Sequence, residues 1–170
     1  MSRERAHSTC LEMLQQRGYS IIDEEDTHIT ALKPDGQQMA VFFHDVPKFG
    51  TKGVKEIISL MNEMEVLHAL VVYKDDVTPF TKSTLTRSEE RRFELFAIED
   101  LQYNITKHRL QPTFERLEEK EAAEFKQKYG MKFGTLRLDR PIARFYDYKR
   151  GDVIRITRPD GYINYRIVKG

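Results

Sequence analysis

The sequence has 170 residues and a formal net charge of +1, and it is long enough to bury one core or two small ones. Its 39% hydrophobic and 32% charged residues are typical of a globular chain and exclude an intrinsically disordered one. We expect no membrane span, no signal peptide and, with Cys10 as the single cysteine, no internal disulfide.

Charge is distributed unevenly along the sequence. Residues 131–170 hold ten Lys/Arg and four Asp/Glu, whereas residues 1–130 hold eighteen and twenty-three. A basic C-terminal part favours an acidic partner, either nucleic acid or protein. A solvated basic face without any partner explains the same charge pattern, and composition does not separate the two interpretations.

The first part of the sequence predicts alternating helices and strands. Apolar residues at helical spacing predict a helix over residues 3–17 with Cys10 on its core face, and residues 23–26 predict an acidic loop. Further helices are predicted after the loop 47–53, from Pro79 and around residues 100–103. The predicted strands are 28–33, 38–44, 68–73 and 93–98. This alternation predicts an α/β domain over residues 1–105 with an open, partly parallel sheet.

The rest of the sequence predicts a small α+β domain over residues 113–170, after a linker at 106–112. We expect a helix over 117–129, a short strand at 136–138 and a helix that begins at Pro141. Two alternating strands, 152–158 and 162–168, meet at the turn Pro159-Asp160-Gly161. In the first of them, Ile154 and Ile156 face one side and Val153, Arg155 and Thr157 face the other.

Motifs for catalysis are missing from the sequence. One cysteine and five scattered histidines do not form a zinc pattern, and Thr51 stands where a phosphate-binding loop ending in Lys52 needs its second glycine. We therefore expect no cofactor, no metal and no small-molecule substrate.

A metal-dependent nuclease remains an enzymatic alternative, with Asp35 as a first acid and Asp45 with Lys48 as the next pair. Lys48 follows Asp45 by three residues, so a strand would point the two side chains to opposite faces. Cleavage that disappears in Asp35→Ala would revive this alternative.

Two loops follow the predicted strands 38–44 and 68–73. The first carries Lys48, Lys52 and Lys55 around a helix start that Thr51 is able to cap, and the second leads through Thr78 into Pro79. If the two strands are parallel neighbours, both loops lie at the edge where open α/β sheets bind ligands. Such a surface binds the phosphate backbone of a duplex without recognising its sequence. A stand-alone DNA-binding module is an alternative function with the same kind of surface. Ordinary capping and solvation account for the same residues.

Several segments resemble a known family. Pro141-Ile-Ala-Arg-Phe, Lys149-Arg-Gly-Asp-Val-Ile and Tyr162-Ile-Asn-Tyr-Arg-Ile-Val resemble the assembly domain of the common RNA polymerase subunit five, which has a smaller counterpart in archaeal polymerases. In the same order as in that family, Val41-Phe-Phe, Pro47-Lys, Ala69-Leu-Val-Val and Thr78-Pro resemble the jaw domain of the eukaryotic subunit. The resemblance spans nearly the whole sequence.

The resemblance implies a non-catalytic subunit of a multisubunit DNA-directed RNA polymerase. It implies that the C-terminal domain docks on the largest polymerase subunit, among other subunits, and that the nuclease-like jaw approaches downstream duplex DNA. A cellular eukaryotic member would be nuclear, and a viral one would be in the virion or a cytoplasmic viral factory. The residues implied to face DNA are Pro47, Lys48, Thr51, Lys52, Thr78, Pro79 and Lys82. Those implied to dock on the partner are Arg144, Phe145, Lys149, Arg150, Arg155, Arg158, Tyr165 and Arg166.

The sequence also departs from the family pattern. The segment Leu136-Arg137-Leu138 lacks the family's proline, and the turn Arg158–Tyr162 is shorter than in the family. These differences affect the docking contacts more than the family resemblance. For Phe145 and Tyr165, the alternative to docking on a partner is a place in the domain's own core. For Ile154 and Ile156, we favour the place in the core.

Overall fold

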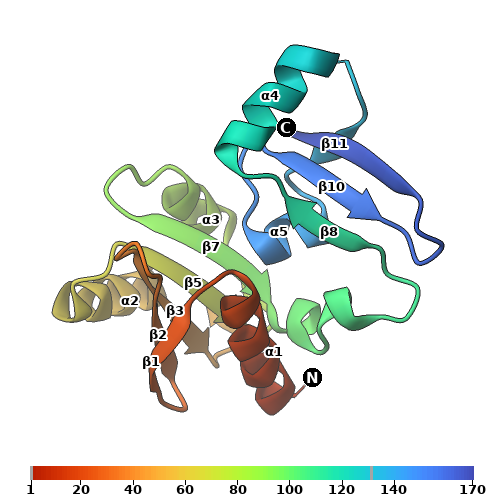
Figure 1. Cartoon of the computed structure of the whole chain (residues 1–170). Coiled ribbons are helices and arrows are strands. Elements are labelled where there is room, and N and C mark those ends of the chain that lie inside the picture. The colour runs from red at the N-terminus through yellow and green to blue at the C-terminus, as the bar shows by residue number, and fades with distance from the viewer. Residues whose placement is uncertain (1, 131) are drawn as a thin grey trace. The chain divides into compact units, whose positions relative to one another are not determined.

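Two larger sheets and one two-stranded sheet organise the chain (Figure 1), whose computed structural model describes residues 2–130 and 132–170. The chain divides into one unit at Met1–Tyr103 and a second at Asn104–Gly170. Each unit combines helices with a sheet of its own. The predicted combination of a larger and a smaller mixed α and β domain is confirmed at this level.

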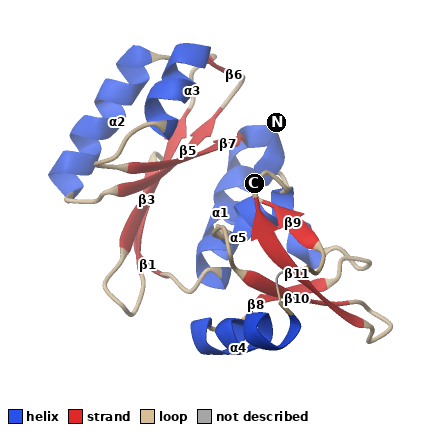
Figure 2. Cartoon of the chain, turned by 90° about the horizontal axis from the view of Figure 1, so that it is seen from above, coloured by secondary structure: helices blue, strands red, loops and turns tan. Residues whose placement is uncertain are grey.

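The first unit is built on a five-stranded sheet in the order β1-β2-β3-β5-β7. Strands β3, β5 and β7 are parallel, and β1 and β2 are antiparallel additions at one side. Helices α2 and α3 lie on one face of the sheet and α1 on the other (Figure 2). The elements are α1 (Arg3–Gln16), β1 (Ser20–Glu24), β2 (His28–Leu32), β3 (Gln38–His44), β4 (Lys48–Phe49), α2 (Thr51–Met64), β5 (His68–Tyr73), β6 (Asp76–Val77), α3 (Pro79–Thr86), β7 (Arg92–Ala97) and the 3₁₀ helix η1 (Ile98–Leu101).

The central strands of this sheet are continuous apolar runs because helices cover both faces. Residues 39–43 of β3 and 69–72 of β5 are all buried, as expected for parallel strands between two helical layers. On one face, Phe42 and Val71 pack with Ile57 and Met61 of α2. Cys10 of α1 is fully buried, which confirms its predicted place in the core.

The second unit is built on a four-stranded sheet in the order β8-β10-β11-β9. The alternation predicted for β10 is confirmed, because Ile154 and Ile156 join one apolar cluster and Val153 joins another. The predicted turn is a hairpin in which the Asp160 side chain accepts a hydrogen bond from the Tyr162 amide at 2.9 Å. The elements are the 3₁₀ helix η2 (Ile105–Lys107), β8 (Thr113–Arg116), α4 (Glu119–Tyr129), β9 (Thr135–Arg137), α5 (Pro141–Tyr146), β10 (Val153–Thr157) and β11 (Ile163–Lys169).

Two local expectations were wrong, and one strand was not predicted. Asp23 and Glu24 belong to β1 rather than to a loop, since an edge strand keeps charged side chains in water. Thr51 is the first helical residue of α2 and not its cap, which is Gly50 without a side-chain hydrogen bond. Strand β8 was not predicted, because its sequence is polar, only Phe114 in it is half-buried, and it pairs with β10, which is distant in sequence.

Among the described residues, no helix combines the length and apolar character needed to cross a membrane.

Candidate nucleic-acid and partner interfaces

The two loops that were predicted to face DNA are held together by a small strand pair. Strands β3 and β5 are parallel neighbours, as the ligand-edge prediction requires, and the loops leave their carboxyl ends. Beyond that edge, β4 pairs with β6 in parallel, with Lys48 opposite Asp76 and Phe49 opposite Val77. The Thr78 amide also donates to the Phe49 carbonyl at 3.3 Å. Both loops therefore lie side by side at one edge of the sheet.

The start of α2 is tightly packed beneath its exposed lysines. Phe49 is fully buried and meets the His44 ring edge-on, with ring centroids 4.6 Å apart. Gly53 lies against both rings, since a Cβ placed there would come within 2.8 Å of His44 Cε1 and 2.9 Å of the Phe49 ring. Burial lowers the pKa of His44, although the charges of Glu56 and Asp45 act in the opposite direction. The amino end of α2 is thus a rigid platform for the exposed Lys52.

The start of α3 is fixed by a threonine cap. The Thr78 hydroxyl accepts a hydrogen bond from the Thr81 amide at 3.2 Å and donates one to the Thr81 hydroxyl at 2.6 Å. Pro79 occupies the first turn, as predicted. Phe80 and Lys82 are exposed beside this cap, and the Phe80 side chain remains outside the apolar cluster under α2 and α3. The DNA-facing role assigned to Thr78 therefore competes with its structural role as a cap.

The loop edge is locally basic within an acidic unit. Residues 45–55 and 74–86 carry five lysines against three aspartates, whereas residues 1–103 hold twelve Lys/Arg against eighteen Asp/Glu. Pro47, Lys48, Thr51, Lys52 and Lys82 are all exposed. Two helix amino ends add partial positive charge at the same edge. This arrangement is able to hold an anion although the unit as a whole repels one.

The acids that the nuclease alternative needs are far apart. Asp35 lies in the turn before β3 and accepts a hydrogen bond from the Gln37 amide at 2.9 Å. Asp45 follows β3 and pairs with Arg3 at 2.9 Å. A seven-residue strand separates them, which at about 3.4 Å per residue exceeds about 20 Å. One metal ion is therefore unable to bridge the pair.

Two further features near this sheet offer no catalytic arrangement. An 880 Å³ cavity at the opposite edge is bordered by Leu67, Phe93 and a mixture of glutamates and arginines. Potential ligand atoms of Asp23, Glu25 and His28 lie within 4.8 Å of one another, but both acids are exposed, Asp23 on the edge strand β1 and Glu25 directly after it. Neither feature places a nucleophile beside a general base.

Several of the predicted docking residues are engaged inside the second unit. Phe145 is 3% exposed, which leaves little of its side chain for a partner. Tyr165 is half-buried, with its ring 4.6 Å from that of Phe125. Arg155 binds Glu121 at 2.7 Å and Glu115 at 3.5 Å, so it already has carboxylate partners.

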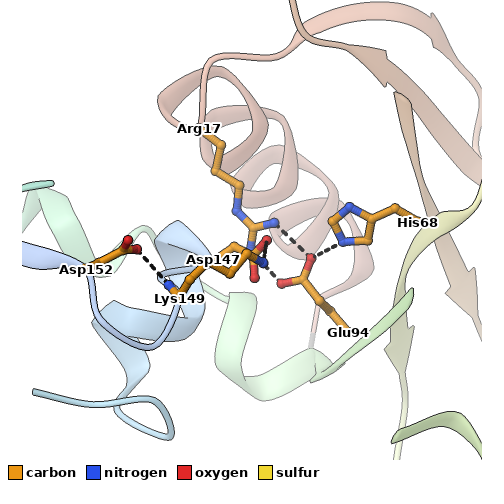
Figure 3. Close-up of polar contacts among 6 residues, drawn as sticks. All are labelled: Arg17, His68, Glu94, Asp147, Lys149 and Asp152. Carbon is orange, nitrogen blue, oxygen red and sulfur yellow. Dashed lines mark hydrogen bonds and ion pairs between the residues drawn. The ribbon is translucent and has the colours of Figure 1, made fainter. Parts of the chain in front are cut away.

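Most of the remaining docking candidates are more accessible. Lys149 is exposed and pairs with Asp147 at 3.0 Å, while its amide donates to Asp152 at 2.7 Å (Figure 3). Arg158 lies over the exposed Tyr162 ring at 5.1 Å. Arg150 and Arg166 are exposed; Arg150 donates to the Gly170 carbonyl and Arg166 to the Thr135 carbonyl. Arg144 is half-buried.

Sequence reasoning missed a buried polar network in the first unit. Arg17 at the end of α1 makes two 2.9 Å hydrogen bonds to Glu94 of β7, and Glu94 also lies 2.7 Å from His68 Nε2 of β5 (Figure 3). Burial alone would raise the pKa of Glu94, but the His68 hydrogen bond and the Arg17 guanidinium hold it well below its usual range. The residues are separated by 77 and 26 positions, so no local sequence signal connects them.

Comparison with known proteins identifies the family. Residues 103–168 match the family model "RNA polymerase Rpb5, C-terminal domain". The chain is 32% identical over 183 residues to "Putative DNA-directed RNA polymerase subunit 454R" of Invertebrate iridescent virus 6, across 97% of this chain and 98% of that protein.

Eukaryotic relatives match over similar lengths. The rpabc1 subunit of DNA-directed RNA polymerases I, II, and III of Dictyostelium discoideum is 32% identical over 183 residues, across 94% of this chain and 93% of that protein. The RPABC1 subunit of Caenorhabditis briggsae is 30% identical over 198 residues, across 96% and 94% of the two chains. The chain therefore belongs to the Rpb5 (RPABC1) family of non-catalytic DNA-directed RNA polymerase subunits.

Proposed function

We propose that the second unit attaches this subunit to the largest subunit of its polymerase, and that the first unit is a jaw that approaches downstream duplex DNA. The observation that carries the jaw assignment is the β4–β6 pair, because it brings both lysine-bearing loops to one edge. The jaw is nuclease-like in its open sheet and acts through charge alone. The domain limits proposed are 1–105 for the jaw, 106–112 for the linker and 113–170 for the assembly domain.

The attachment is supported by the charge of the second unit. Residues 104–170 hold sixteen Lys/Arg and nine Asp/Glu, and Lys149, Arg150, Arg158 and Arg166 are exposed. Arginine forks suit carboxylates and carbonyls on a protein partner. Co-purification of the full chain with the largest subunit tests the attachment. Arg150→Glu combined with Arg158→Glu should abolish recovery without loss of helical signal, and undiminished recovery would count against this docking surface.

The jaw assignment is tested in the assembled polymerase on a template with an extended downstream duplex. Lys52→Ala and Lys82→Ala should each reduce the slope of log affinity against log salt by about 1, the effect of one lost phosphate contact. Lys33→Ala is the matched control, because Lys33 precedes β3 at the opposite edge of the same sheet. Unchanged salt slopes for both loop variants would contradict the proposed contact between the jaw and the duplex.

The cellular location follows from the polymerase that the subunit joins. Viral and eukaryotic relatives support a viral transcription site in one case and the nucleus in the other. A stand-alone DNA-binding role is disfavoured, because the excess of acids in residues 1–103 opposes binding of an isolated chain to DNA.

A further inference from the structure

The edge of the first sheet opposite the two loops is hollowed. Strands β3, β5 and β7 are parallel, so their amino ends meet at this edge. The 880 Å³ cavity lies at these strand ends, and a second cavity of 310 Å³ is bordered by residues of β1, β2 and β3. Gln38 and Val66 border both cavities, which therefore form one groove, the edge groove.

The edge groove combines a buried apolar floor with two exposed apolar side chains. Val66 and Leu85 of the floor are almost completely buried. Leu67 is 65% exposed beside the larger cavity, and Ile22 is 57% exposed beside the smaller one. Ile22 is the extra residue of a β-bulge, because the pairing of β1 with β2 shifts around it. A single exposed apolar residue assigns no role, but two that border one groove indicate a place for an apolar ligand.

Acidic residues predominate along the edge groove. Seven Asp/Glu and three arginines lie in the segments that border it, residues 22–31, 36–39, 64–68 and 85–93. Arg91 donates to Asn62 Oδ1 at 2.8 Å and its side chain is 20% exposed, whereas the Glu90 side chain is 87% exposed. Helices α2 and α3 end at this edge, so their carboxyl ends add partial negative charge. The groove therefore attracts cationic groups, in contrast to the loops at the other edge.

We propose that the edge groove binds a basic, extended segment of a partner protein. Large apolar side chains of that segment pack beside Leu67 and Ile22, and its lysines or arginines lie on the acidic rim. Two adjoining cavities suit an extended chain, in which alternate side chains point the same way.

Charge complementarity selects this occupant over two others. A nucleic-acid backbone is repelled by the acidic rim, and a second copy of this chain would bring a second acidic rim against the first. The groove lies at the edge opposite the two jaw loops, so this binding does not depend on contact between the jaw and DNA.

The first test titrates the full chain with fluorescently labelled peptides in which two leucines at varied spacing are flanked by lysines. At least one peptide should bind with a Kd below about 100 μM. Affinity should fall at least about tenfold when alanine replaces both leucines, because less apolar area then leaves water. It should also fall when glutamate replaces the lysines. Absence of binding across the panel, or equal binding of the glutamate peptides, would overturn the proposal.

Variants of the chain show whether the peptide occupies the edge groove. Leu67→Ser should weaken binding about tenfold, and Glu65→Gln combined with Glu89→Gln about threefold. The matched controls are Phe80→Ser and Glu99→Gln, since Phe80 is 71% exposed at the start of α3 and Glu99 is exposed after the carboxyl end of β7. Both controls should leave the affinity unchanged. Equal losses in the groove variants and the controls would show nonspecific attraction and overturn the proposal.

The second test identifies the partner of the polymerase assembled in cells. The photoreactive p-benzoylphenylalanine replaces Leu67, and mass spectrometry identifies the crosslinked segment. That segment should carry Lys or Arg beside a large apolar residue, and Glu65→Lys combined with Glu89→Lys should abolish the crosslink. A crosslink to DNA, to a second copy of this chain or to an acidic segment would overturn the proposal, as would the absence of any crosslink. The salt slopes of Lys52→Ala and Lys82→Ala test the jaw separately, so each proposal is able to fail alone.

Discussion

Arg17 and Glu94 form a bidentate pair that joins the end of α1 to β7 across 77 residues of sequence. The Arg17 side chain is 2% exposed and that of Glu94 is 11% exposed, so neither charge is well solvated. His68 of β5 binds the same carboxylate, which extends the link to a second strand. This network ties the helix on one face of the first sheet to two of its parallel strands.

Replacement of Glu94 by Gln should destabilise the first unit by on the order of 3 kcal/mol at pH 7, because Arg17 loses a buried counter-charge. The folded-state pKa of Glu94 is depressed, so its contribution is fully present above the unfolded pKa of about 4.3 and is lost as pH falls below it. Urea unfolding at several pH values should show the difference between wild type and variant shrinking from pH 6 to pH 3. The exposed Glu89→Gln is the control, and a difference independent of pH would contradict the assignment.

Cys10 should be unreactive in the folded chain. Its side chain is fully buried, and burial raises the pKa of its thiol to about 12, whereas the thiolate is the reactive species. At pH 8 we expect alkylation by iodoacetamide at least about 100-fold slower than in the urea-unfolded chain, at a rate set by opening of α1. Mass spectrometry of the intact chain measures both rates. Similar rates in the two states would show that α1 is not packed as described.

Gly53→Ala should destabilise the first unit even though alanine favours helices. The new methyl would approach His44 Cε1 to 2.8 Å and the buried Phe49 ring to 2.9 Å. Overpacking of this kind costs about 1–3 kcal/mol and outweighs a gain of about 1 kcal/mol in helix propensity. Thermal unfolding measures the balance. Gly50→Ala is the matched control because a Cβ there meets open space, and a stabilised Gly53→Ala would show that the rings move aside.

Arg155→Ala should change the stability of the chain only slightly. Its guanidinium pairs with Glu121 and Glu115, but the Arg155 side chain is 30% exposed and both glutamates are about half exposed. Such pairs contribute about 0–1 kcal/mol. Chemical unfolding should therefore give Arg155→Ala nearly the same free energy of unfolding as Arg158→Ala, a variant on the exposed hairpin turn. A loss of several kcal/mol would assign Arg155 to the core of this unit rather than to a docking surface.

The sequence by itself determined the elements that depend on local patterns. Strands β3 and β5 are apolar runs with the same bounds as predicted, Pro79 marks the start of α3, and the turn at residues 159–161 forms a hairpin. The alternation of β10 also predicted which residues enter each apolar cluster. Periodicity and turn chemistry act over a few residues, so they can be read without a structure.

Only the tertiary structure decided the features that join distant segments. Strand β8 is polar and becomes a strand by pairing with β10. The parallel pairing of β5 and β7 brings His68 and Glu94 together, and packing of α1 on the sheet brings Arg17 to the same carboxylate. The β4–β6 pair likewise unites two loops that are separate in sequence. Phe80 is exposed although an apolar side chain of its size is usually buried. Sheet pairing and burial depend on long-range contacts, which a local sequence pattern does not contain.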